Sequence, residues 1–249
     1  MAAAFLNEAR SWRSLGMAGR YLEALQSVAP GPCPADASAA NNTQEFQSDM
    51  GTVTEQHRAV AMHAIKVMGA EGQPKVQTFH DDHRLRSVDI LTTFSSPEAG
   101  LKSISSIGLS DSVLRHAEGH ELETRVELCA CAEQDALHWD NVVASTAFAI
   151  MRDRAAVQPG SVIPDILRDY FPSTRLPHVY LVPPFFWNDA RFPGLQFPPV
   201  AINWLQCIAI HESERQLVER IGGDAFDDLL QRHEVDVLDM HRAPVAGAL

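Results

Sequence analysis

The sequence has no apolar run as long as a membrane-spanning helix requires, which is about 18 residues, although 45% of its 249 residues are hydrophobic. Residues 1–21 also lack the basic start and the continuous apolar stretch of a secretory signal. The first absence argues against an integral membrane protein and the second against a secreted one. We therefore expect a cytoplasmic protein that makes no membrane contact.

Basic residues are scarce. The sequence has 20 Lys and Arg against 32 Asp and Glu, and its formal net charge is −12. Proteins that bind nucleic acids or anionic membranes rely on clustered Lys and Arg to neutralise phosphates. The charge balance therefore argues against both kinds of partner. An acidic surface attracts basic molecules, so a basic protein is the kind of partner that the charge favours.

Cysteines are few and scattered, at Cys33, Cys129, Cys131 and Cys207. This number and spacing exclude a secreted disulfide scaffold. Cys129 and Cys131 alternate along an expected strand and would point to one face of a sheet. They lack the second pair that a structural zinc site requires, so we expect buried free thiols. No glycine-rich phosphate loop follows any expected strand, and no internal repeat is present.

The chain divides near residue 50. Residues 4–29 place apolar side chains at helical spacing. Residues 30–44 then hold three prolines in five positions, followed by small and polar residues, which is typical of a linker. We predict an N-terminal helix and a Pro/Ala-rich linker over residues 1–50, and one main domain over residues 51–245.

Within the main domain, the spacing of apolar residues and of helix-ending signals predicts a helix between Thr54 and Gly69. Strands are expected at 75–79, 86–94, 101–107, 121–131 and 200–210, and in 178–187, where Pro183–Pro184 ends the strand. A long helix is expected at 135–156 and a short helix or turn at 162–171. Two helices end the domain. We expect a capping box of Ser213 and Gln216 to open the first and Asp224 to cap the second, before a frayed tail at 243–249. Because strands and helices are clustered rather than alternating, we predict an α+β fold with a mixed, largely antiparallel sheet flanked by helices.

Two short segments contain potential metal ligands. His116 and His120 lie in HAEGH (116–120), and two histidines four residues apart can share a zinc ion if the backbone there is helical. Gly119 and the alternating segment after it instead favour a turn. His80, Asp82 and His83 lie in HDDH (80–83), between two expected strands, where Asp is also typical of hairpin turns.

We favour turns at both segments and predict no metal. A composite site that joins His80 or His83 to His116 and His120 remains open, because the strand order could bring these loops together.

Two further segments hold clusters of residues that could form a catalytic site or a binding site. HESE (211–214) resembles a catalytic cluster, but it lies between a strand and a helix, where carboxylates favour the helix N-terminus. Residues 185–192, FFWNDARF, place four aromatic rings in a connection. These rings either form a satellite core or expose an anchor for a protein partner. As a hypothesis for partner binding we name Phe186, Trp187 and Asp189.

Taken in order, residues 54 to about 242 resemble the suppressor-of-fused domain family. The stretches that carry the resemblance are the helix that ends at Gly69, VDILTTF (88–94), SSIGLSD (105–111), ELCAC (127–131), HVYLVPP (178–184), INWLQCIAIHESE (202–214) and Gly222–Gly223. Gly108, Ser110, Glu127 and Glu214 match family positions, and we interpret them as structural. The first 50 residues fall outside the resemblance.

The resemblance implies an α+β protein-binding domain with no catalytic residues and no cofactor. Single-domain bacterial members resemble immunity proteins that neutralise a toxin, so the leading hypothesis is a bacterial immunity protein with a basic toxin domain as its partner. Two alternatives remain. One is a metal-dependent hydrolase that uses HDDH and HAEGH, and the other is a regulatory scaffold with a cellular partner.

Overall fold

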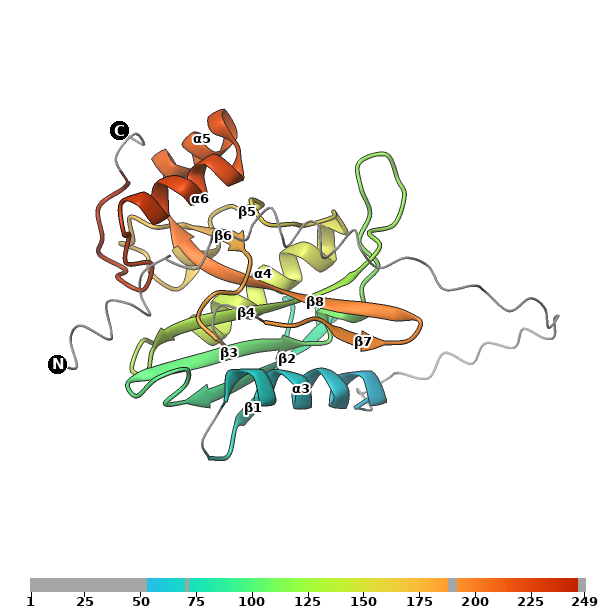
Figure 1. The fold of residues 1–249 in the computed structure, drawn as a ribbon. Helices are drawn as coiled ribbons and strands as arrows, with labels where there is room; N and C mark the ends of the chain where they lie inside the picture. The colour runs from blue at the N-terminus through green and yellow to red at the C-terminus, as the bar shows by residue number, and fades with distance from the viewer. Residues whose placement is uncertain (1–52, 70–71, 188–191, 246–249) are drawn as a thin grey trace, which may run out of the picture.

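The structure is a computed structural model, and it describes residues 53–69, 72–187 and 192–245 (Figure 1). The helix expected at 4–29 and the boundary expected near residue 50 lie outside these ranges, so both stay predictions. No helix in the described ranges is long and apolar enough to cross a membrane.

The described strands form one eight-stranded sheet. They are β1 (Lys75–His80), β2 (Ser87–Phe94), β3 (Leu101–Ile107), β4 (Arg125–Glu133), β5 (Val162–Ile163), β6 (His178–Val182), β7 (Leu195–Phe197) and β8 (Val200–Ile210). The strand order is β1-β2-β3-β4-β8-β6-β5, and β7 pairs with β8 beside this path. The β4–β8 pair is parallel and the other pairs are antiparallel. The predicted α+β fold with a mixed, largely antiparallel sheet is therefore confirmed.

The described helices are α3 (Glu55–Met68), α4 (Trp139–Asp153), α5 (Glu212–Ile221) and α6 (Gly223–Arg232). The ends predicted for α3 are confirmed. The Thr54 hydroxyl accepts a hydrogen bond from the His57 N–H, and Gly69 ends the helix at a φ of 65°, a left-handed conformation that glycine adopts without steric cost. Helix α4 is shorter than the predicted 135–156 and begins after His138, which has a φ of 65°.

The caps predicted for the last two helices are wrong. Helix α5 begins after His211, whose backbone N–H donates to the Glu214 carboxylate at 2.9 Å. The first turn is therefore closed by Glu214 rather than by Ser213 and Gln216. Helix α6 begins at Gly223, with Gly222 as its N-cap, so Asp224 lies inside its first turn.

Helices cover both faces of the sheet. Helix α4 contacts β2, β3 and β4 on one face, and α3 contacts β2, β3 and β7. Alternate residues of β8 show which helices share a face. On one face, Leu205, Cys207 and Ala209 join the core beneath α4. On the other face, Ile202 and Trp204 join the core beneath α3. Ile208 and Ile210, on that same face, join the core of α5 and α6. Helices α3, α5 and α6 therefore cover the face opposite α4.

Several boundaries differ from the predictions. Strand β4 begins at Arg125 rather than 121, because residues 116–122 form a hairpin turn of their own. The segment expected as a short helix or turn at 162–171 contains the two-residue strand β5 and a 3-10 helix at Ile166–Asp169. Strand β7 was not predicted. The tail is ordered further than expected, because Val245 is buried and its N–H donates to Glu214.

Candidate functional site

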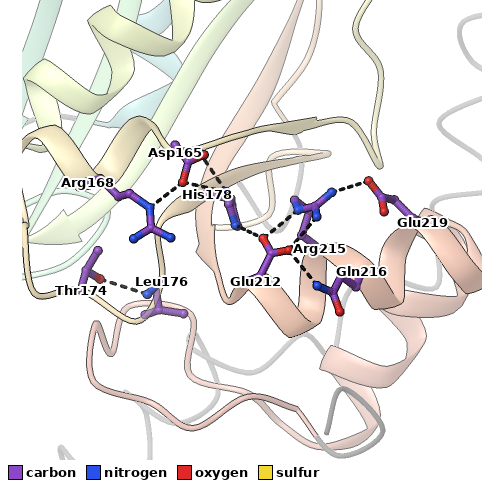
Figure 2. A network of polar contacts seen from close by, with 9 residues as sticks. All are labelled: Asp165, Arg168, Thr174, Leu176, His178, Glu212, Arg215, Gln216 and Glu219. Carbon is purple, nitrogen blue, oxygen red and sulfur yellow. Dashed lines mark hydrogen bonds and ion pairs between the residues drawn. The ribbon is translucent and has the colours of Figure 1, made fainter.

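A polar network joins β6 to the start of α5 (Figure 2). The imidazole of His178, on β6, is almost fully buried, with 3% of the side chain exposed. Its Nε2 atom lies 2.7 Å from a carboxylate oxygen of Glu212, the first residue of α5. Its Nδ1 atom accepts a hydrogen bond of 3.0 Å from the backbone N–H of Asp165. A buried histidine paired with a carboxylate is a common catalytic arrangement, so its protonation decides what this pair can do.

Both ring nitrogens of His178 are engaged. Because Nδ1 accepts a backbone hydrogen bond, the proton of the neutral ring lies on Nε2 and is donated to Glu212. The Glu212 carboxylate also accepts hydrogen bonds from Arg215 and Gln216, and these hold its pKa far below the usual range. His178 therefore has no free nitrogen with which to take a proton from a substrate. This network connects β6 with α5 and offers no general base.

A second network fixes the C-terminal segment. The guanidinium of Arg242 donates two hydrogen bonds to the fully buried carboxylate of Glu214, at 2.6 and 2.7 Å. The N–H groups of His211 and Val245 donate to the same carboxylate, each at 2.9 Å. Burial alone would raise the pKa of Glu214, but Arg242 and the two amides outweigh it and the pKa is lowered. Glu214 therefore holds the end of the domain against α5.

A third carboxylate, Glu127 on β4, holds the turn after β3. One oxygen accepts hydrogen bonds from the N–H groups of Gly108 and Ser110, at 2.9 and 3.0 Å, and the other accepts from the hydroxyl of Ser106. Gly108 has a φ of 107°, which L side chains rarely adopt. The interpretation of SSIGLSD as a required turn, with Gly108, Ser110 and Glu127 as structural residues, agrees with these contacts.

The segment HDDH forms the turn between β1 and β2. The carboxylate of Asp81 accepts hydrogen bonds from the N–H groups of Leu85 and Arg86, at 2.7 and 3.2 Å. His80, Asp82 and His83 are exposed around this turn. The predicted hairpin turn is therefore present.

The segment HAEGH also forms a turn, in which the His116 N–H donates to the His120 carbonyl at 2.9 Å. The expectation that its two histidines meet only on a helix is wrong, because their rings stack with centroids 4.4 Å apart. Among the described residues, the set of side chains close enough to share a metal ion is His116, Glu118 and His120. The structure does not add His80, Asp82 or His83 to this set, so the two segments do not form a composite site.

The aromatic segment packs inward. Trp187 is 1% exposed and its indole N–H donates to the Ser103 hydroxyl at 2.6 Å, while Phe185 and Phe192 are also buried. This placement fits a satellite core rather than an exposed anchor for Trp187. Phe186 is half-buried between Phe185 and Trp187, and Asp189 lies outside the described residues.

The cysteines of the described ranges match the predicted buried thiols. Cys129, Cys131 and Cys207 are buried and form no disulfide bond, and Cys129 and Cys131 join the same core cluster on one face of the sheet. Burial raises the pKa of Cys129 and of Cys207 above the usual range. These thiols are protonated at neutral pH and are poor nucleophiles. Cys33 lies outside the described residues.

The sequence did not reveal the partners of the buried ionisable groups Glu214 and His178. Glu214 and Arg242 are 28 residues apart, and His178 and Glu212 are 34 apart, so no local spacing connects them. The one available signal was composition, since His211, Glu212 and Glu214 lie together at the end of an apolar strand. Groups buried at such a junction require partners, but the sequence does not say which ones.

Comparisons with known proteins give consistent results. The family model described as Suppressor of fused protein (SUFU) matches residues 84–243. The immunity protein YqcF of Bacillus subtilis (strain 168) is 31% identical over 193 residues, which cover 78% of this chain and 98% of that protein.

Three solved structures share the fold. A putative SUFU homolog from Neisseria gonorrhoeae FA 1090 matches with a TM-score of 0.57 and 14% identity, covering 76% of this chain and 96% of its own. The Sufu–Fu complex gives a TM-score of 0.57 and 13% identity, covering 76% and 91%. Drosophila Suppressor of Fused gives 0.55 and 13% over 76% of this chain and 51% of its own, so this chain spans about half of that protein. The family match over residues 84–243 and the 31% identity to YqcF show that the chain belongs to the suppressor-of-fused family.

Proposed function

We propose that this protein is a non-catalytic binding module that acts in the bacterial cytoplasm as an immunity protein and neutralises a toxin domain by binding it. The observation that carries the proposal is the 31% identity to the immunity protein YqcF, which extends over 98% of that relative. A match over nearly the whole length of a relative supports a shared mode of action more strongly than a match to one motif.

The chemistry of the described residues supports binding rather than turnover. The buried ionisable groups at the junction of β6, β8 and α5 have charged partners: His178 contacts the half-exposed Glu212, and Glu214 contacts the buried Arg242. Catalytic groups instead need free nitrogens, oxygens or thiolates that face a substrate. The solved Sufu–Fu complex, in which a protein of this fold has a protein partner, also supports a protein ligand here.

The net charge suggests the nature of the partner. With a formal charge of −12, the chain attracts a basic domain through long-range electrostatics, which raise the association rate and weaken in salt. We infer that the toxin domain is basic. Its affinity for this protein should therefore fall as ionic strength rises, mainly through a slower association rate.

The test is a growth assay in a bacterial host. Each candidate toxin domain from the source strain is expressed from an inducible promoter, with and without the full chain. The proposal expects that one toxin stops growth alone, that coexpression restores colony numbers to those of the uninduced host, and that the two proteins copurify in a one-to-one complex. If none of the toxins is relieved, the immunity proposal is wrong. A relieved toxin that forms no complex would instead point to a catalytic or regulatory action.

A further inference from the structure

The hairpin at residues 114–122 projects from the sheet between β3 and β4 (Figure 1). Its backbone is well defined by hydrogen bonds. The Leu122 N–H donates to the Leu114 carbonyl at 2.8 Å, and the Gly119 N–H donates to the His116 carbonyl at 2.8 Å. Gly119 has a φ of 90°, so the tight tip of this turn favours glycine. These backbone hydrogen bonds form the turn together with the Arg115 guanidinium, which donates to the Gly119 carbonyl at 3.0 Å.

The base of the hairpin is fixed to the rest of the domain. The Arg115 N–H donates to the Arg154 carbonyl at 2.9 Å, and the Ala156 N–H donates to the Arg115 carbonyl at 2.8 Å. Arg115 also pairs with Glu121 at 2.9 Å. The tip is thus anchored to the chain that follows α4, and the positive charge of Arg115 is balanced by a carboxylate within the hairpin.

Three side chains converge at the tip. One ligand atom from each of His116, Glu118 and His120 lies within 4.8 Å of the other two. In the described structure these three side chains make no hydrogen bond and no ion pair, and the rings of His116 and His120 stack with centroids 4.4 Å apart. Stacking accounts for the meeting of the two imidazoles, but it does not account for the Glu118 carboxylate beside them.

We propose that His116, Glu118 and His120 form a binding site for a divalent transition metal ion, with zinc as the preferred cellular ion. Two imidazoles and one carboxylate are a ligand set that zinc uses in proteins, with water completing the coordination. In a tetrahedral zinc site the ligand atoms are about 3.3 Å apart. The three ligand atoms lie within 4.8 Å of one another, so they must move closer together to bind the ion, and the exposure of Glu118 and His120 leaves their side chains room to rotate.

The site does not depend on the proposed function. It uses the half-buried His116 and the exposed Glu118 and His120 at the tip of a hairpin, away from the polar networks around α5.

The test uses the full chain after chelator treatment, titrated with zinc chloride at neutral pH in a calorimeter. We expect one ion per chain. His116→Ala and His120→Ala should each weaken binding by more than about tenfold, and Glu118→Gln should weaken it less. His83→Ala is the matched control, because His83 is an exposed histidine in another hairpin turn, and it should leave the affinity unchanged.

A second measurement separates this site from weak binding to scattered histidines. In a spectrum of ¹⁵N-labelled histidine rings, zinc should shift the signals of His116 and His120 and leave that of His83 in place. Circular dichroism of each variant checks that the fold is retained. If the wild-type chain does not bind one equivalent of zinc, or if the double variant His116→Ala/His120→Ala binds it with the wild-type affinity, the proposal is wrong.

Discussion

Two buried glutamates of this protein hold backbone segments in place in a similar way, but their pKa values are shifted in opposite directions. Glu127 and Glu214 are both fully buried, and each accepts two backbone hydrogen bonds that fix a turn or a chain end. Glu214 also faces the guanidinium of Arg242, whereas the hydrogen bonds to Glu127 come from two amides and a hydroxyl. As a result, the pKa of Glu214 is lowered and that of Glu127 is raised, with burial as the largest cause of the increase.

The comparison shows that the geometry of a carboxylate does not by itself indicate its charge. At Glu127 the shape of the acceptor matters most, because a neutral group with an oxygen in the same place can hold the turn. At Glu214 the charge matters as well, because Arg242 cannot release its proton and would remain buried without a counter-ion. The same substitution, Glu to Gln, should therefore have very different effects at the two positions.

The largest effect is expected for Glu214→Gln. This change leaves the buried guanidinium of Arg242 without its partner, and breaking a buried pair on one side costs about 3–5 kcal/mol of unfolding free energy. Urea denaturation followed by circular dichroism measures the difference. A loss of less than about 1 kcal/mol would mean that Arg242 finds another anion or reaches water.

The stabilisation by Glu214 should also depend on pH. Because its folded-state pKa lies below the ordinary value of 4.5, this contribution is complete above about pH 4.5 and is lost as the pH falls through the folded pKa. The difference in unfolding free energy between the wild type and Glu214→Gln should therefore shrink in acid. A constant difference between pH 7 and pH 3 would contradict the lowered pKa.

A smaller loss of unfolding free energy is expected for Glu127→Gln, and its pH dependence should be opposite to that of Glu214→Gln. The amide oxygen of Gln can accept the hydrogen bonds from Gly108 and Ser110, so the loss at neutral pH should be about 1 kcal/mol or less. Because the folded pKa of Glu127 is raised above 4.5, the wild type binds the extra proton in the folded state and loses stability as the pH rises above about 4.5.

The unfolding free energy of Glu127→Gln, relative to that of the wild type, should therefore be higher at pH 7 than at pH 4.5. Denaturation curves at the two pH values measure this change. A variant that becomes relatively less stable as the pH rises would show that Glu127 is stabilised as a carboxylate.

The smallest effect is expected for Glu219→Gln. Glu219 pairs with Arg215 on the exposed side of α5, and 63% of its side chain is exposed. Exposed ion pairs contribute about 0–1 kcal/mol, and salt weakens them. This variant is the matched control for Glu214→Gln, since both remove one carboxylate charge from the same helix. If Glu219→Gln lost as much unfolding free energy as Glu214→Gln, the cause would be the removal of a negative charge from α5 rather than the broken pair with Arg242.

Local features of the fold could be predicted from the sequence. Thr54 and Gly69 mark the ends of α3 because capping depends on residues within one turn. The start of α5 was predicted wrongly because Ser213–Gln216 and His211–Glu214 have the same spacing, and only the end of β8 determines which pair closes the turn. Contacts such as Glu214–Arg242 depend on the folding of distant segments, which one sequence does not reveal.

The candidate sites show the same limit. Gly119 correctly indicated a turn at HAEGH, but the convergence of His116, Glu118 and His120 depends on the conformation of that turn. For Trp187, composition left a core and a binding role open, and the hydroxyl of Ser103, 84 residues away, fixes it inside.

The most direct test of the central claim, that this protein neutralises by binding, is a titration of the toxin that it relieves. A fixed amount of purified toxin is mixed with increasing amounts of the full chain, and the remaining toxin activity is measured after short and long incubation. Binding predicts that activity reaches its minimum at one chain per toxin and that the end point does not change with time. Loss of toxin activity that continues at substoichiometric amounts would show turnover and contradict the account.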